Sequence, residues 1–159
     1  MNTQDFYIAK SYDLVEYGSE TSGVPLSEAL RFHLTATLAR FFNQPLDPDQ
    51  LTVRLNCLFD EREGSGKIKR IGDECLLTCG IFAKRLERLG GTGPYVGLGR
   101  TAYIQAGLTE AAYGFHLMLD VLRHISGRPE GVEAVALALQ GSASAENKLK
   151  DQGILIFRK

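Results

Sequence analysis

The segment from Lys67 to Gly91 carries the strongest periodicity in the sequence. Apolar residues recur there at steps of three and four, which keeps them on one helical stripe: Ile68, Ile71, Cys75, Cys79, Phe82, Leu86 and Leu89. Leu76, Leu77 and Ile81 make the middle of the segment apolar nearly all round. The pattern therefore predicts a central helix that is the most buried one of the fold.

Two glycines interrupt this predicted helix. Gly72 and Gly80 each cost about 1 kcal/mol relative to alanine inside a helix. We therefore expect each of them to mark either a break in the helix or a place where another backbone comes close.

Further segments are predicted to be helical from their stripes and end signals. They are Leu26 to Phe41, 47 to 63, the stretch that begins at Pro94, 109 to 126 and 130 to 140, followed by an exposed one at 142 to 152. Asp47, Pro48 and Gln50 form the start of the second, and Thr109 is the predicted cap of the fourth.

The two ends of the chain lack such a pattern. The segment 1–24 fits neither helical nor strand spacing and is expected to be irregular or to form short strands. The tail 153–159 contains four consecutive apolar residues, Ile154 to Phe157, which we expect to be buried. Residues 5–9 in a short strand pair, or a neighbouring subunit, are the predicted hosts.

Length and charge limit the class of protein. A chain of 159 residues fits one domain, so we predict a single all-α domain over 1–159 with at most one short pair of terminal strands. The 18 basic and 19 acidic residues nearly balance, which argues against nucleic-acid or membrane partners. The N-terminus lacks the pattern of a secretion signal, and no run reaches the ~18 apolar residues of a membrane span. We expect a cytoplasmic protein.

The stretch GTGPYVGLGRTAY at 91–103 resembles a dinucleotide-binding turn. Gly97, Gly99 and Ala102 give the spacing, but only two residues separate Pro94 from Gly97, too few for the buried strand that such a turn follows. Pro94 is better placed as a first helical residue. The small residues then allow a neighbouring helix to pack closely.

Three cysteines and a lone histidine have simple interpretations. An odd number of cysteines without an export signal favours reduced thiols. Cys75 and Cys79 lie four apart and could share a metal with Cys57, but their place on the apolar stripe favours core thiols. His33 lies at the edge of its helical stripe and is expected to be a hydrogen-bonded boundary residue.

His116, Asp120 and His124 are spaced so that they stack on one helical face. Such a face could bind a divalent metal or transfer protons, or it could be a solvated surface with ordinary side-chain pairs. The second interpretation is favoured, and we expect neither a metal nor a cofactor.

Tyr95, Arg100 and Tyr103 form a second candidate ligand-binding set. A guanidinium binds carboxylate or phosphate, and tyrosines combine ring area with a polar tip. The alternative, two aromatic residues at the edge of the core and a surface arginine, is favoured. The sequence contains no catalytic triad, phosphate loop or nucleophile elbow, so enzymatic activity has no support.

The segments GDECLLTCGIFAKRL and PYVGLGRTAY resemble a family of uncharacterised bacterial proteins. The matching residues are Gly72, Asp73, Leu76, Gly80, Phe82, Tyr95, Gly99, Ala102 and Tyr103, and the similarity covers roughly residues 26 to 126. This resemblance implies a predominantly helical domain and no known activity.

These observations lead to two functional expectations. The first is a non-enzymatic helical interaction or scaffold protein that forms a homodimer, because apolar helix faces are abundant and catalytic motifs are absent. The alternative is a small-molecule or metal-binding protein that uses the face of His116, Asp120 and His124 or the region of Tyr95, Arg100 and Tyr103.

Overall fold

The structure is a computed structural model, and it describes residues 3–43, 64–87 and 90–126. Every regular element in these ranges is a helix. In chain order they are α1 (Thr3–Ser22), α2 (Glu28–Asn43), α4 (Gly64–Ile81), α5 (Ala83–Glu87), α6 (Gly93–Gln105), α7 (Thr109–Tyr113) and α8 (Phe115–Ser126). The prediction of an all-α fold is confirmed for this part of the chain.

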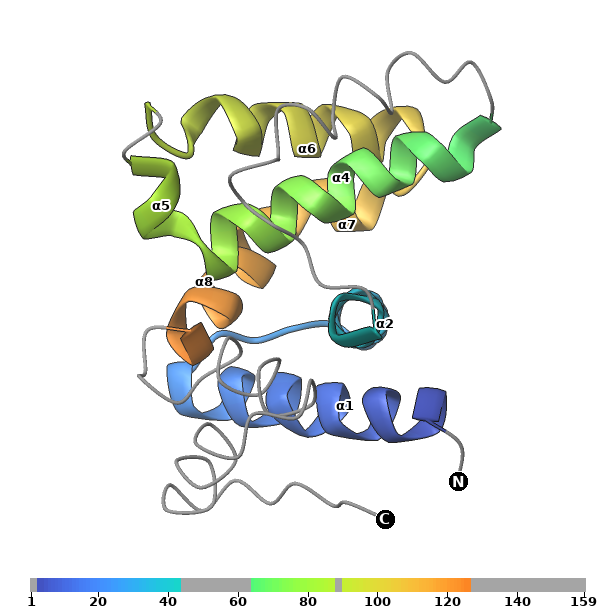
Figure 1. Cartoon of the computed structure of the whole chain (residues 1–159), viewed down its shortest axis with the longest axis vertical. Coiled ribbons are helices and arrows are strands. Elements are labelled where there is room, and N and C mark those ends of the chain that lie inside the picture. Colours follow the sequence, from blue (N-terminus) through green and yellow to red (C-terminus); the bar gives the residue numbers. More distant parts are fainter. Residues whose placement is uncertain (1–2, 44–63, 88–89, 127–159) are drawn as a thin grey trace.

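The helices are arranged around α4. In Figure 1, α2 is seen end-on between α1 on one side and α4 on the other, while α6 covers the far side of α4. α4 contacts α6 and α8, and α1 contacts α2 and α8. Every residue from 71 to 80 is buried. The predicted central helix is thus confirmed, although it ends at Ile81 and the chain continues as the short α5.

Gly72 and Gly80, the two glycines predicted to mark a break or a close approach, lie at close contacts. A Cβ atom at Gly72 would lie 2.5 Å from ring atoms of Tyr103, and one at Gly80 would lie 2.6 Å from Leu122. The end of α4 also meets α8, where Ser126 Oγ donates a hydrogen bond to the Gly80 carbonyl at 3.0 Å. The last carbonyls of a helix lack partners within it, so α8 supplies one where α4 stops.

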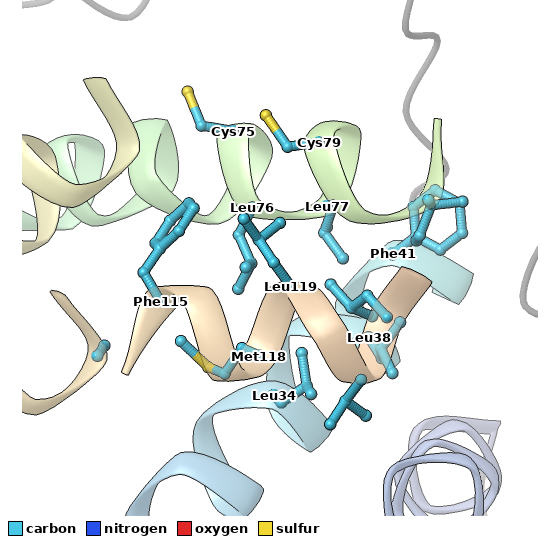
Figure 2. Close-up of a cluster of buried hydrophobic side chains, with 14 of the residues drawn as sticks. Leu34, Leu38, Phe41, Cys75, Leu76, Leu77, Cys79, Phe115, Met118 and Leu119 are labelled. Carbon is cyan, nitrogen blue, oxygen red and sulfur yellow. The ribbon is translucent and has the colours of Figure 1, made fainter. Parts of the chain in front are cut away.

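The apolar core joins α2, α4 and α8. Leu34 and Leu38 of α2 meet Leu76 of α4 and Met118 of α8 (Figure 2). Cys75 and Cys79 lie on the opposite side of α4 from Leu76 and Leu77. A Cβ atom at Gly99 would lie 2.9 Å from Cys75 Cβ, which places this side of α4 against α6.

The prediction for the N-terminal segment is wrong, because residues 3–22 form α1. Small and polar residues occupy much of its buried side, including Ser11, Gly18 and Ser19 beside Leu14 and Val15, so the apolar spacing is incomplete. Gly18 allows α8 to approach: a Cβ atom there would lie 2.7 Å from Ile125. A strand pair that uses residues 5–9 is excluded.

The glycine-rich stretch forms α6, as predicted, with Pro94 in its first turn. Gly99 packs against Cys75 and Phe115. Gly97, in contrast, is exposed and would have open space around a Cβ atom. Close packing therefore explains one of these two glycines and not the other.

The predicted helix over 109–126 is divided in two. α7 ends at Tyr113, Gly114 is its C-cap, and α8 begins at Phe115. Thr109 is the first residue of α7, whereas Leu108 holds the cap position. The side chain of Leu30 fills the space beside Gly114, where a Cβ atom would lie 2.5 Å from it, so α2 packs at the joint.

Several predictions lie outside the described residues. These are the helices at 47–63, 130–140 and 142–152, the tail 153–159 and the environment of Cys57. Within the described part of the chain, no helix is both long and apolar enough to cross a membrane.

Candidate functional site

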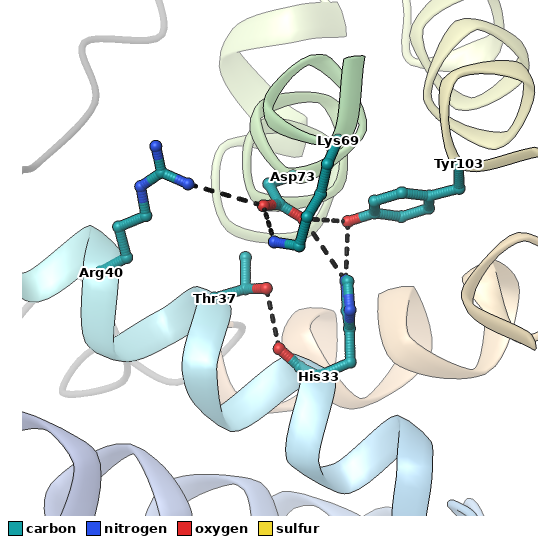
Figure 3. Close-up of polar contacts among 6 residues, drawn as sticks. All are labelled: His33, Thr37, Arg40, Lys69, Asp73 and Tyr103. Carbon is teal, nitrogen blue, oxygen red and sulfur yellow. Dashed lines mark hydrogen bonds and ion pairs between the residues drawn. The ribbon is translucent and has the colours of Figure 1, made fainter. Parts of the chain in front are cut away.

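A buried carboxylate connects three helices. Asp73 of α4 has a side chain that is only 4% exposed. Its partners come from α2 (His33 and Arg40), from α6 (Tyr103) and from the preceding turn of α4 (Lys69), as Figure 3 shows. We refer to these five residues as the Asp73 cluster.

Both oxygens of Asp73 have partners. The Tyr103 hydroxyl donates to Oδ1 at 2.6 Å, and Lys69 Nζ donates to Oδ2 at 2.7 Å. His33 Nε2 lies 3.0 Å from the Tyr103 hydroxyl oxygen and 3.4 Å from Oδ1. Tyr103 donates its only hydroxyl proton to Asp73. The hydrogen bond between His33 Nε2 and the Tyr103 hydroxyl oxygen therefore requires a proton on His33 Nε2.

These contacts keep Asp73 ionised and Tyr103 neutral. Burial raises the pKa of Asp73, but hydrogen bonding from His33, attraction to Lys69 and hydrogen bonds from Lys69 and Tyr103 outweigh it, and the pKa lies below its usual value. Burial, and then the negative charge of Asp73, raise the pKa of Tyr103 well above its usual value. Neither group is poised to exchange a proton near neutral pH.

The Asp73 cluster holds helices together. Tyr103 is completely buried, with its ring against Phe115 and against the edge of His33. The only cluster members with substantially exposed side chains are Lys69 and Arg40. A reactive group needs access to a substrate, and this hydroxyl has none, so the geometry indicates a structural junction of α2, α4 and α6.

The sequence alone predicts no role for Asp73 beyond its place in the family resemblance. The signal was a charged residue within a segment that is apolar nearly all round, because a buried charge requires partners. Lys69, one helical turn earlier, and His33, at the edge of its stripe, were the available partners. His33 is a hydrogen-bonded boundary residue, as predicted.

A second feature is a groove between α1 and α2. It has a volume of about 1180 Å³, and the residues of α1 that line it include Tyr7, Ile8 and Tyr12. α2 contributes large, small and charged side chains: Glu28, Arg31, Phe32, Thr35, Ala36, Ala39, Arg40 and Asn43. We refer to this surface as the α1–α2 face.

Apolar side chains are uncovered on the α1–α2 face. Phe32 is 75% exposed, the highest value among the large apolar residues described, and Tyr12 and Ile8 are also exposed. Two buried polar atoms on the same face, Arg31 Nε and Thr35 Oγ1, have no hydrogen-bond partner among the described residues. Exposed apolar area of this kind is typical of a surface that binds a partner.

Tyr95, Arg100 and Tyr103 are not brought together by α6. Arg100 is exposed, and its Nε donates to the Ala112 carbonyl of α7 at 3.3 Å. Tyr103 is directed into the Asp73 cluster, while Tyr95 is partly buried against the core. The three side chains therefore serve different contacts.

His116 and Asp120 are exposed on α8, as the predicted solvated face requires. His124 is partly buried, and its Nε2 lies 2.8 Å from Thr21 Oγ1 of α1. Within residues 3–43, 64–87 and 90–126, no group of three or more histidine, cysteine, aspartate or glutamate side chains is placed to hold a metal. Metal binding on this face stays a prediction without geometric support.

Cys75 and Cys79 are free thiols in the core, as predicted. Burial raises the pKa of each to about 12, so neither is a thiolate near neutral pH.

No family model matches the chain, and no curated protein or solved structure matches it either.

Proposed function

We propose that the chain is a non-enzymatic helical interaction protein that forms a homodimer through the α1–α2 face. The observation that carries this proposal is Phe32, a phenylalanine that is 75% exposed at the groove between the two helices. Fully burying such a side chain contributes about 1.5 to 3 kcal/mol, so contact with a partner at Phe32 would favour association.

The charged residues of the face support a second copy as its partner. A two-fold symmetric contact requires a surface that is complementary to itself. The α1–α2 face meets this requirement, because apolar residues lie between an acidic residue, Glu28, and a basic one, Arg40.

The described residues also favour binding over catalysis. Within the Asp73 cluster, Asp73 and Tyr103 are closed off in the junction, so neither is accessible to a substrate. The α1–α2 face, in contrast, contains no histidine or cysteine.

Multi-angle light scattering after size exclusion tests the proposal. We expect a dimer at micromolar concentrations, and Phe32→Gln should raise its dissociation constant by roughly ten- to a hundredfold, because a central aromatic contact is lost. Tyr113→Gln is the matched control, since Tyr113 is 68% exposed but does not line the groove. A wild-type monomer at all concentrations, or equal effects of both variants, would refute the proposal.

A further inference from the structure

Four exposed residues form a ridge along α2. Glu28, Phe32, Ala36 and Arg40 follow one another at intervals of four, and all four line the groove. Residues at this interval form one of the ridges by which helices pack against each other. The ridge is therefore the part of the α1–α2 face that a partner helix would meet first.

The order of residues in this ridge is complementary to its own reverse. When the ridge is aligned with its own reverse, each acidic residue lies opposite a basic one, and each large apolar residue lies opposite a small one. Glu28 and Arg40 lie at equal distances from position 34, and so do Phe32 and Ala36. Two copies of the ridge can therefore pair when they run in opposite directions.

We propose that α2 pairs with the α2 of a second copy in an antiparallel arrangement, with the two-fold axis beside position 34. Glu28 then faces Arg40 of the partner subunit, and Phe32 packs over Ala36 of the partner subunit. This inference rests on the proposed homodimer and specifies which residues determine its register. Ridges at intervals of four interdigitate at a crossing angle of about −50°, and Ala36 leaves room there for the phenylalanine ring.

A parallel arrangement lacks this complementarity. It would place Glu28 against Glu28 of the partner subunit and Arg40 against Arg40 of the partner subunit, and like charges in contact are unfavourable. It would also place the two Phe32 rings against each other and leave the two alanines without a large partner. The antiparallel register satisfies every position of the ridge.

The contacts within one chain leave Arg40 able to take part. Its Nη1 lies 3.8 Å from Asp73 Oδ2, an oxygen that already accepts a hydrogen bond from Lys69 at 2.7 Å. A guanidinium has five N–H donors in a fork, so Arg40 can reach outward while it remains near Asp73. Arg31, the other basic residue of the face, is paired with Glu16 of α1 at 3.2 Å.

Exchange of the charges tests the register. Glu28→Arg and Arg40→Glu each place like charges at both symmetric contacts, and each variant alone should raise the dimer dissociation constant at least about tenfold. Mixed in equal amounts, the two variants restore opposite charges at both contacts. We therefore expect a heterodimer with a dissociation constant within about threefold of the wild-type value. Asp120→Arg, an acid-to-arginine change on the exposed face of α8, is the control.

Arg40→Glu adds a carboxylate near Asp73, so circular dichroism must show that the variant is folded. If it is not folded, a double-mutant cycle of the dimer dissociation constant with Glu28→Gln, Arg40→Gln and the double variant tests the register instead. The two changes should be coupled, so the second should weaken the dimer less when the first is already present. No heterodimer from folded variants, or no coupling in the cycle, would overturn the register. If Phe32→Gln still disrupts the dimer in that case, the proposed homodimer stands with a different register. A wild-type monomer overturns both.

Discussion

Two regions of this molecule depart from the usual distribution of polar and apolar residues, in opposite directions. The junction of α2, α4 and α6 buries an ionised Asp73, whereas the α1–α2 face exposes Phe32. The buried polar region is complete, since both carboxylate oxygens have partners within the chain. In the apolar region, by contrast, the side chains of Phe32, Tyr12 and Ile8 are exposed and have no cover within the described chain. The exception that the chain satisfies by itself has a structural role, and the one left uncovered supports the binding surface that we propose.

The largest effect is expected from breaking the junction. Asp73→Ala removes the acceptor of the Tyr103 hydroxyl in a buried site and should lower the free energy of unfolding by about 2 to 4 kcal/mol. Chemical denaturation measures this loss. The matched control is Asp120→Ala on the exposed face of α8, which should change stability by less than about 0.5 kcal/mol. A loss of unfolding free energy for Asp73→Ala as small as that for Asp120→Ala would show that the cluster contributes no stability.

The next largest change in stability is expected from a substitution that disturbs the close packing of α6 against α4. Gly99→Leu should destabilise the fold by about 1 to 3 kcal/mol or more, because its Cβ alone would lie 2.9 Å from Cys75 Cβ and from the Phe115 ring. Gly97→Leu, two residues earlier on the exposed side of α6, should instead stabilise the helix by about 0.5 to 1 kcal/mol. Thermal melts of the pair measure both changes, and destabilisation by both variants would contradict the assignment of Gly97.

The pH dependence of the junction should be smaller but specific. The folded-state pKa of Asp73 lies below the unfolded value of 3.8, so its stabilisation is fully present above 3.8 and is lost as the pH falls through the folded pKa. The difference in melting temperature between the wild type and Asp73→Asn should therefore be constant from about pH 7 to 5 and shrink on further acidification. A difference that grows on acidification would contradict an ionised Asp73.

The helices with complete apolar stripes could be predicted from the sequence. Most residues of the stripes in α2 and α4 are buried, including Leu30, Leu34, Cys75 and Cys79, while Ile68 is partly buried, so the spacing indicated the buried face. α1 could not be predicted, because its buried side includes Ser11, Gly18 and Ser19, which carry no apolar signal.

The two sites differ in a similar way. Phe32 could have been recognised, since it lies on the side of its helix away from the leucine stripe, where a large apolar residue has no core to fill. The Asp73 cluster depends on contacts between α2, α4 and α6 that are far apart in the sequence. Its pairing could not be derived from spacing within any one helix.

Sedimentation equilibrium of the wild type beside Phe32→Gln and Tyr103→Phe tests the central claim most directly. Tyr103→Phe loses the hydrogen bonds to Asp73 and His33. It should melt at a lower temperature yet still form the dimer at a temperature where it is folded. The Phe32→Gln monomer should melt at the same temperature as the wild-type monomer. It should also sediment with the mass of a single chain at concentrations where the wild type is a dimer. A wild type that sediments as a single chain throughout, or a Phe32→Gln variant with the wild-type dimer constant, would contradict the assignment of the α1–α2 face as the binding surface.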